Sequence, residues 1–214
     1  MQRGKFITFE GSEGCGKSTQ IGRFVDWLRA GGREVLLTRE PGGTVLGERI
    51  RELLQHDPAG EGMVPESELL LFAASRAQLV RQSILPALEA GKWVVADRFL
   101  DSTTVYQGVG RGLDVAAVRR INAFAVGAAM PDLTFLLDLD AATGHTRAVL
   151  ATGVGGDRME SEPLAFFEAV RQGYLDLARE EPERIAVVDA SRSVEEVFSS
   201  LRQLFEERFS TQVR

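Results

Sequence analysis

Cysteine and histidine are scarce in this sequence. Cys15 is the single cysteine, and His56 and His145 are the two histidines. One cysteine cannot build an internal disulfide framework, and these three residues are too few for a zinc site made of cysteine and histidine. The sequence therefore favours a reducing compartment and excludes a scaffold that depends on disulfides or zinc.

A long apolar run and an excess of positive charge are also missing. No segment approaches the length needed to cross a bilayer, and Met1 to Gly4 lead into an apolar stretch without the pattern of an export signal. The formal net charge of −6 at pH 7 argues against general nucleic-acid binding. We therefore expect a cytoplasmic protein without membrane or nucleic-acid partners, which binds a small anion through locally concentrated arginines and backbone N–H groups.

The alternation of apolar runs with amphipathic stretches predicts an α/β fold. The length of 214 residues, with 44% hydrophobic and 26% charged residues, is typical of one globular domain, which we place at 1–214. The short runs are nearly all apolar, as in a parallel sheet that is buried on both faces. They cover 5–10, 34–38, 93–96, 133–137 and 185–188.

Helical spacing of apolar residues predicts the helices between these strands. They cover 18–30, 45–55, 66–89, 114–126 and 194–209, and two more lie between 137 and 185. The long stretch 66–89 is interrupted at most by Pro86. The glycine-rich stretch 152–156 separates the two later helices, which predicts a short mobile lid at about 151–160.

A phosphate-binding motif follows the first predicted strand. Residues 11–18 read GSEGCGKS and match GxxxxGK[ST] between a strand and a helix. In this motif backbone N–H groups and a helix N-terminus cradle phosphates, Lys17 reaches the β- and γ-phosphates of ATP, and the Ser18 hydroxyl binds Mg²⁺. An accidental glycine-rich turn is the alternative. The predicted ATP site consists of Gly11, Ser12, Glu13, Gly14, Cys15, Gly16, Lys17, Ser18 and Thr19.

Asp97 directly follows the predicted strand at 93–96. Together with the phosphate-binding motif this position predicts a carboxylate that orients Mg²⁺, so we expect Ser18 and Asp97 to form the metal site. The alternative role of Asp97 is to cap a helix, jointly with Asp101 or Ser102. Cys15 is expected to be a small filler of the phosphate loop and not a nucleophile.

Six blocks, in order along the chain, carry a resemblance to a known family. They are 6–11 with the phosphate-binding motif, 38–44, 71–78, 97–99, 102–108 and 157–160. In these blocks nearly the whole chain resembles bacterial thymidylate kinases, within the nucleoside-monophosphate kinase group. The resemblance implies a P-loop NTPase fold with a five-stranded parallel β-sheet flanked by α-helices, transfer of the γ-phosphate of ATP to dTMP, and a cytoplasmic homodimer.

Matching the blocks residue by residue implies an acceptor site. By this resemblance Phe72 stacks on the thymine ring and Arg76 donates to a thymine carbonyl. Glu13 accepts from the sugar 3′-hydroxyl, and Tyr106 crowds the position of a ribose 2′-hydroxyl. The implied acceptor site consists of Glu13, Arg39, Pro41, Phe72, Arg76, Arg98, Thr103, Tyr106 and Gln107.

The chemistry of such a transfer agrees with these residue types. The acceptor is a phosphate whose second pKa is about 6, so no general base is required. The reaction instead needs positive charge that suppresses the repulsion between two anions. By the resemblance Arg98 and Arg39 face the acceptor phosphate, and we expect Lys17 and Arg98, with Asp97 and Mg²⁺, to act in catalysis. Taken singly, each arginine fits a solvated surface charge and Phe72 fits a core residue.

The arginine expected beside the transferring phosphate is a departure from the family pattern. Residues 12–15 of the phosphate loop include no basic residue, so the lid must supply it. Lids of the bacterial branch commonly carry an Arg-Gly pair, where this chain has Thr152 and Gly153. We assign catalysis to Arg158 and a contact with adenine or a phosphate to Arg147, the alternative for Arg158 being a structural ion pair. The segment 189–191 resembles the loop that borders adenine and contributes Ala190, unless it is only a helix cap.

Two other functions remain open from the sequence. A kinase for another nucleoside monophosphate, such as dUMP, differs only in the acceptor, and the thymine methyl group is worth no more than about 10- to 200-fold in discrimination. A P-loop switch protein would bind ATP or GTP and signal by ordering a segment. The absence of a visible GTP-base motif and the presence of the acceptor blocks argue against the switch.

Overall fold

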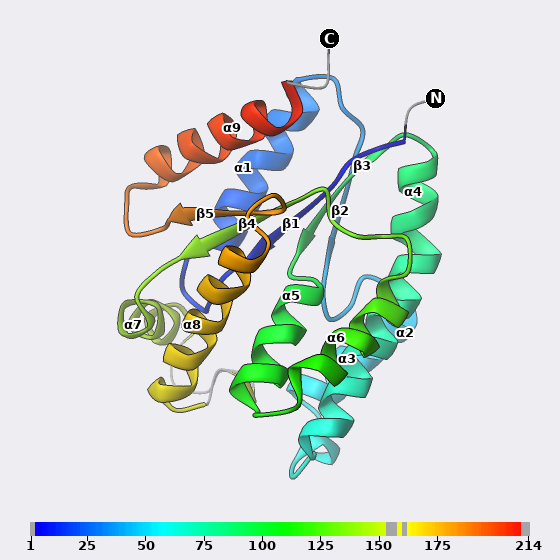
Figure 1. Ribbon diagram of the computed structural model, residues 1–214, viewed down its shortest axis with the longest axis vertical. Helices are drawn as coiled ribbons and strands as arrows, with labels where there is room; N and C mark the ends of the chain where they lie inside the picture. The colour runs from blue at the N-terminus through cyan, green and yellow to red at the C-terminus, as the bar shows by residue number, and fades with distance from the viewer. Residues whose placement is uncertain (1–2, 153–157, 160–161, 211–214) are drawn as a thin grey trace.

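A five-stranded parallel sheet forms the centre of the protein (Figure 1). The computed structural model describes residues 3–152, 158–159 and 162–210. The strand order is β2-β3-β1-β4-β5, and every neighbouring pair is parallel. The strands are β1 (Phe6–Glu10), β2 (Val35–Arg39), β3 (Trp93–Asp97), β4 (Leu133–Asp138) and β5 (Ile185–Asp189). The predicted α/β class and five-stranded parallel sheet are confirmed, with strand ends within a residue or two of the predicted ones.

Both faces of the central strands are buried, as the nearly all-apolar runs predicted. In β1, Ile7 and Phe9 belong to the apolar core on one face, whereas Phe6 belongs to the core on the other. In β3, Val95 likewise packs on the first face, and Val94 packs on the second. This alternation follows from the period of two in a strand, so a nearly all-apolar run is typical of a strand that is covered on both faces.

Helices cover the two faces of the sheet. On one face α1 and α9 lie side by side, and their apolar residues share a core with β1, β3 and β4 (Figure 1). On the other face α4 packs on β3, and α8 packs on β4 and β5. The helices are α1 (Lys17–Ala30), α2 (Val45–Gln55), α3 (Pro65–Leu79), α4 (Leu85–Glu89), α5 (Leu100–Thr103), α6 (Val115–Val126), α7 (Ala141–Thr152), α8 (Leu164–Glu180) and α9 (Val194–Ser210).

Two stretches have π-helical geometry that apolar spacing did not predict. The single helix expected at 66–89 is α3 followed by a π-helical segment, η2 (Val80–Ile84), and then α4. Pro86 lies in the first turn of α4, just after this segment, where its missing N–H is accommodated by the wider turn. A second π-helical segment, η3 (Thr104–Gly110), continues from α5. The connection between α2 and α3 contains one short 3₁₀ turn, η1 (Pro58–Gly60).

The carboxyl ends of the parallel strands meet at one edge of the sheet. The phosphate-binding motif follows β1, Glu40 and Pro41 follow β2, and Asp97 ends β3. In open α/β sheets this edge is where ligands bind, because loops after neighbouring strands converge there. Within the part of the chain that the structure describes, no helix has the length and apolar character of a membrane span.

Candidate active site

The phosphate loop has a backbone that only glycine adopts readily. Gly11 has φ 140° and Gly14 has φ 67°. A Cβ added at Gly14 would lie 2.1 Å from the carbonyl oxygen of Gly144, and one at Gly11 would lie 2.5 Å from that of Leu137. Both positions therefore combine positive φ with a close backbone approach, which explains why the motif has glycine there.

Lys17 lies across the inside of this loop. Its side chain is buried, and Nζ donates to the carbonyl oxygens of Gly11 at 3.0 Å and Ser12 at 3.1 Å. Lys17 also begins α1, whose N-cap is Gly16, a residue without a side chain that could cap the helix. The first backbone N–H groups of α1 and the ammonium group therefore form a positive end suited to phosphate.

Arg98 connects the phosphate loop with α5 and α8. Its Nη1 donates to the Gly11 carbonyl at 3.0 Å, Ser102 Oγ at 3.2 Å and Tyr174 Oη at 3.4 Å. Its Nη2 forms an ion pair with Glu13. Arg98 is the one non-glycine residue with positive φ, 66°, among the residues that the structure describes. Such a backbone is costly and persists where surrounding contacts hold it, as at many functional sites.

Glu13 stays negatively charged because cations surround it. Burial alone would raise the pKa of this carboxyl, but Arg98 and Lys17 together lower it below its ordinary value. The Tyr106 hydroxyl donates to Glu13 Oε1 at 3.2 Å, and the guanidinium of Arg98 lies over the Tyr106 ring at 5.2 Å. Glu13 is therefore a hydrogen-bond acceptor that links the phosphate loop to η3.

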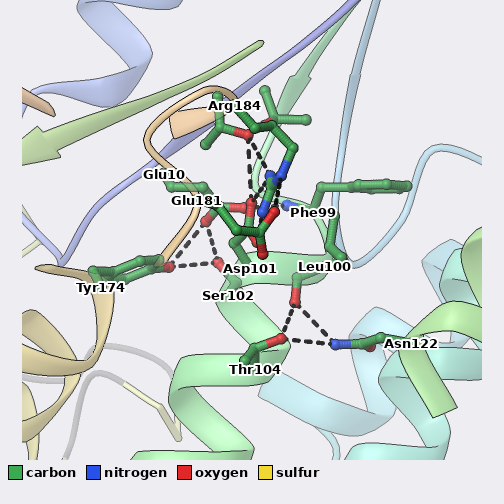
Figure 2. A network of polar contacts seen from close by, with 12 residues as sticks. Glu10, Phe99, Leu100, Asp101, Ser102, Thr104, Asn122, Tyr174, Glu181 and Arg184 are labelled. Atoms are coloured by element: carbon green, nitrogen blue, oxygen red, sulfur yellow. Dashed lines mark hydrogen bonds and ion pairs between the residues drawn. The ribbon is translucent and has the colours of Figure 1, made fainter. Parts of the chain in front are cut away.

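Behind Arg98, Glu10 ends β1 in a fully buried position. Glu10 accepts from the backbone N–H of Phe99 at 2.8 Å, from Ser102 Oγ at 2.6 Å and from Tyr174 Oη at 2.9 Å (Figure 2). Burial, and then the nearby charge of Asp101, raise the pKa of Glu10 to about 7. The hydroxyls of Ser102 and Tyr174 bond to both Glu10 and Arg98, so this network holds Arg98 in place.

Arg76 on α3 is held on all sides by the protein. Its Nε donates to Glu40 Oε2 at 2.8 Å, Nη1 to Asn122 Oδ1 at 2.7 Å and Nη2 to Thr103 Oγ1 at 2.7 Å. Nη2 also donates to the Phe99 carbonyl at 3.3 Å. Its side chain is only 1% exposed. Arg76 is thus a fixed part of the wall and not a surface charge.

One cavity of about 510 Å³ joins the phosphate loop to the predicted acceptor site. Its size suits a nucleotide-sized ligand. Of the residues predicted from the sequence, those that line this cavity are Glu13, Gly14, Cys15, Gly16, Lys17, Ser18, Thr19, Arg39, Pro41, Phe72, Arg76, Asp97, Arg98, Thr103, Tyr106, Gln107 and Arg147. These residues come from five of the six matching blocks and from Arg147, so segments from different parts of the chain meet around one space.

Other predicted residues lie outside this lining. Gly11 and Ser12 accept hydrogen bonds from Lys17 Nζ through their backbone carbonyl oxygens. Ala190 is 4% exposed, donates its backbone N–H to the Asp138 carbonyl at 2.9 Å, and packs in the core beneath α1 and α9. Most of the lid expected at 151–160 lies outside the described residues, and Arg158, which is described, is not among the residues that line the cavity.

Arg158 pairs with a residue of α3. Its Nη2 lies 2.5 Å from Glu68 Oε2, and its Nε donates to the Leu54 carbonyl at 3.1 Å. This placement gives Arg158 a structural partner other than its sequence neighbours. Arg147, by contrast, lines the cavity next to the phosphate loop, where a Cβ on Gly14 would lie 3.1 Å from its Cβ.

Several residues of the site were not singled out from the sequence. Glu40, Ser102, Arg51 and Gln55 line the cavity. Glu40 lies within one of the matching blocks, and its place beside proline and glycine after a strand was the available signal. Arg51 carried no signal, because a single arginine on an amphipathic helix fits a surface residue equally well.

The oxygen-bearing side chains at the end of β3 are suited to bind a divalent cation. Asp97 Oδ1 is buried and has no hydrogen-bond partner among the described residues, whereas most buried carboxylate oxygens are bonded. The Ser18 side chain lines the same cavity. The helix-cap alternative is not what the structure has, since Phe99 occupies the N-cap position of α5, without a side-chain cap. No group of three or more His, Cys, Asp or Glu residues suited to a metal occurs within the described ranges, so phosphate oxygens would have to complete the coordination.

A phosphate loop on a five-stranded parallel sheet, opening into a cavity with arginines on the acceptor side, defines a P-loop nucleotide kinase. Comparison with known proteins agrees. The family model for thymidylate kinase matches residues 9–201. The thymidylate kinase of Deinococcus radiodurans is 50% identical over 208 residues, covering 97% of this chain and 99% of that protein. That of Desulfosudis oleivorans is 52% identical over 197 residues, covering 90% and 92%.

A solved structure gives the same result. The crystal structure of thymidylate kinase from Ehrlichia chaffeensis superimposes with a TM-score of 0.76 at 34% identity, covering 95% of this chain and 99% of that one. The chain therefore belongs to the thymidylate kinase family.

Proposed function

We propose that this protein transfers the γ-phosphate of ATP to dTMP, giving dTDP and ADP. The observation that carries the proposal is the cavity that the phosphate loop, Arg98, Phe72 and Arg76 line together. Membership of the thymidylate kinase family supports the same substrates. ATP then occupies the phosphate loop, and the acceptor occupies the part of the cavity beyond Arg98.

The charges of the site support direct transfer between two phosphates. Lys17 and the N-terminus of α1 lie on the donor side, whereas Arg98 and Arg39 lie on the acceptor side. Arg98 is held by Glu13 and by the hydroxyls of Ser102 and Tyr174, so its position is preorganised before substrate binds. The acceptor phosphate is largely ionised at neutral pH, so the protein has to neutralise charge and align the groups, without abstracting a proton.

The acceptor side has the shape and polarity of a pyrimidine site. Phe72 offers a ring face, and Thr103 and Gln107 lie near it along the cavity. Arg76 has five N–H groups, and hydrogen bonds to Glu40, Asn122, Thr103 and Phe99 use four. We assign the remaining N–H of Nη1 to one carbonyl of the base.

The sugar is assigned to Glu13 and Tyr106. The charged Glu13 carboxylate is an acceptor for the 3′-hydroxyl, and the adjacent Tyr106 ring fills the space beside it. A ribose 2′-hydroxyl would meet this ring, which favours deoxyribose. Gly14, Cys15, Gly16 and Thr19 line the donor side with Lys17 and Ser18.

The oxygen ligands available in the cavity support Mg²⁺ as the cofactor. Ser18 and Asp97 would hold it, and the ion would neutralise charge on the β- and γ-phosphates.

The lid arginines complete the proposal: Arg147, which lines the cavity, contacts adenine or a phosphate, and Arg158 approaches the transferring phosphate after leaving Glu68. Ala190 is proposed to border the adenine from the end of β5.

We also propose a homodimer that works in the cytoplasm. Large apolar side chains are exposed on α3 and on the two helices that it contacts, α2 and α6, with exposed fractions of 57% for Leu70 on α3, 84% for Val45 on α2 and 83% for Phe124 on α6. A second copy of the chain would cover such a patch. Sedimentation of the purified protein measures this assembly, and a monomer at micromolar concentration would contradict it.

The test of the function is a coupled assay of ADP formation with Mg²⁺, ATP and a panel of nucleoside monophosphates. Turnover should require an acceptor and should be fastest with dTMP, and Lys17→Ala should abolish it while the protein stays folded. Faster turnover with dUMP or a purine nucleotide would assign another acceptor. Slow hydrolysis that no acceptor stimulates would indicate a P-loop switch protein instead.

A further inference from the structure

Glu68 is a buried carboxylate next to the acceptor side of the cavity. It lies on α3, one turn before Phe72, and its side chain is 1% exposed. Its oxygens accept hydrogen bonds from three side chains: Gln107 Nε2 at 2.8 Å, Arg111 Nε at 3.2 Å and Arg158 Nη2 at 2.5 Å. The roles proposed above use this carboxylate only as the partner that Arg158 leaves, and they give it no part in the base site, to which Gln107 belongs.

Two arginines keep Glu68 ionised. Arg111 reaches both carboxylate oxygens, since its Nη2 also donates to Oε2 at 3.3 Å. Burial alone would raise the pKa of Glu68, but the hydrogen bonds from Gln107, Arg111 and Arg158 lower it below its ordinary value. An ionised carboxylate only accepts hydrogen bonds, so Glu68 has nothing to donate to a neighbouring amide.

The ionised Glu68 carboxylate restricts the side-chain amide of Gln107 to one of its two orientations. The amide nitrogen has to face Glu68, because an amide oxygen in that place would meet a negative acceptor. The oxygen Oε1 is then turned away from Glu68. Gln107 itself is 1% exposed and lines the same cavity as Phe72 and Thr103.

We propose that Glu68 is a positioning residue that sets base specificity by holding Gln107 with Oε1 as a hydrogen-bond acceptor for the ring N–H of the pyrimidine. This inference rests on the proposed function, since it assumes that the base lies beside Gln107. It adds a reason for the choice of base that shape alone does not supply.

The two pyrimidine classes differ at this ring position. Thymine and uracil carry N3–H, a donor between two carbonyl groups, whereas cytosine has an unprotonated N3, an acceptor. With Oε1 fixed toward the base, a thymine forms a hydrogen bond and a cytosine places two acceptors against each other. A site built for a donor rejects a ligand that lacks it, because a buried polar group stays unpaired. Glu68 therefore selects dTMP and dUMP over dCMP.

The experiment compares kcat/KM for dTMP and dCMP in the wild-type protein and in Glu68→Gln. The introduced amide keeps an oxygen for Arg111 and Arg158, and its N–H group can donate to Gln107. The Gln107 amide group can therefore flip, so that its oxygen faces residue 68 and its nitrogen faces the base. The ratio of kcat/KM for dTMP to that for dCMP should fall by about 10- to 100-fold, with KM for ATP unchanged. An unchanged ratio in a folded variant overturns the proposal.

Two further variants separate positioning from a general structural effect. Glu162→Gln removes the other carboxylate that binds Arg111, without a bond to Gln107, and should leave the ratio unchanged. Gln107→Met removes the amide that Glu68 orients, and should lower the ratio at least as much as Glu68→Gln. If Glu68→Gln fails to fold, the Gln107→Met result decides: a retained ratio overturns the proposal.

Failure of the proposed function would look different. A wild-type protein that does not phosphorylate dTMP with ATP refutes that function before any variant is compared. A wild-type protein that phosphorylates dTMP and rejects dCMP, with both variants retaining that ratio, refutes only the role of Glu68.

Discussion

Arg76 and Glu40 form an ion pair inside the molecule, with Arg76 Nη2 2.6 Å from Glu40 Oε2 and the two side chains 1% and 3% exposed. Burial raises the pKa of Glu40 to about 7, although the charge and hydrogen bond of Arg76 lower it. Glu40 follows β2 and Arg76 lies on α3, so the pair joins two walls of the cavity. Removing one partner leaves the other buried without compensation, which is costly.

Replacing Arg76 should therefore affect both acceptor binding and stability. In Arg76→Ala we expect KM for dTMP to rise about 10-fold or more and KM for ATP to change little, because the arginine lies only on the acceptor side. The free energy of unfolding should fall by about 3 to 5 kcal/mol. Steady-state kinetics and urea unfolding measure the two effects. Arg81→Ala, which removes an arginine bound to α6 carbonyls, should leave both KM values unchanged. Equal changes in the two KM values would argue against a base-binding role.

Replacing each of the two candidate lid arginines, Arg158 and Arg147, shows which one serves the transferring phosphate. If Arg158 serves the transferring phosphate, Arg158→Ala should lower kcat by about 100-fold or more with nucleotide binding nearly unchanged. Its contact with Glu68 would then be one of two positions of the side chain. Parallel single-turnover measurements with Arg147→Ala supply the comparison. A loss of only a few fold in Arg158→Ala, with a large loss in Arg147→Ala, would transfer the role to Arg147.

The sheet and phosphate loop could be predicted because their signals are local. Five apolar runs and one glycine-rich motif are readable within a few residues, and Lys17 and Asp97 follow from their place after a strand. The π-helical segment η3 could not be predicted, because its wider turn leaves no spacing of apolar residues that differs from an irregular helix. Tyr106 and Gln107 lie on this segment, and only the resemblance to a family pointed to them.

The buried carboxylates of the site could not be predicted from the sequence either. Glu40 and Glu68 look like surface residues by type, since glutamate is almost never fully buried without a partner. Their partners, Arg76 for one and Arg111 for the other, lie 36 and 43 positions further along the chain. Such pairs depend on tertiary structure alone, so a single sequence does not show them. Arg158 was singled out for catalysis as one of two arginines available in the lid region, while its contact with α3 became visible only in three dimensions.

Removal of the proposed metal carboxylate should change the requirement for Mg²⁺. Asp97→Asn keeps the shape of the side chain but loses its negative charge, so we expect the Mg²⁺ concentration for half-maximal activity to rise about 10- to 100-fold. Activity measured against MgCl₂ at fixed ATP gives this value, and chelation of divalent cations should stop turnover of the wild-type protein. Asp114→Asn, a helix cap of α6, is the control for loss of a carboxylate. An unaltered Mg²⁺ dependence in Asp97→Asn would remove this residue from the metal site.

Glu10 should make the stability of the protein depend on pH. Its pKa is about 7 in the folded protein, against an ordinary value of 4.5, because burial and then the charge of Asp101 disfavour the carboxylate. The folded state therefore binds the proton more tightly than the unfolded state does. This contribution to stability is fully present below pH 4.5 and is lost as the pH rises through 7.

The variant Glu10→Gln isolates that contribution. It keeps an oxygen for the Phe99 N–H, and its amide N–H can donate to the hydroxyls of Ser102 and Tyr174, so the network around Arg98 can be retained. Between pH 4.5 and pH 8 the wild-type protein should lose about 3 kcal/mol more free energy of unfolding than Glu10→Gln does. Urea unfolding across this range measures the difference, and Glu40→Gln, tested alone, should remove a separate part of the slope. Parallel pH profiles of wild type and Glu10→Gln would mean that Glu10 is ionised throughout, held so by Arg98 and its hydrogen bonds.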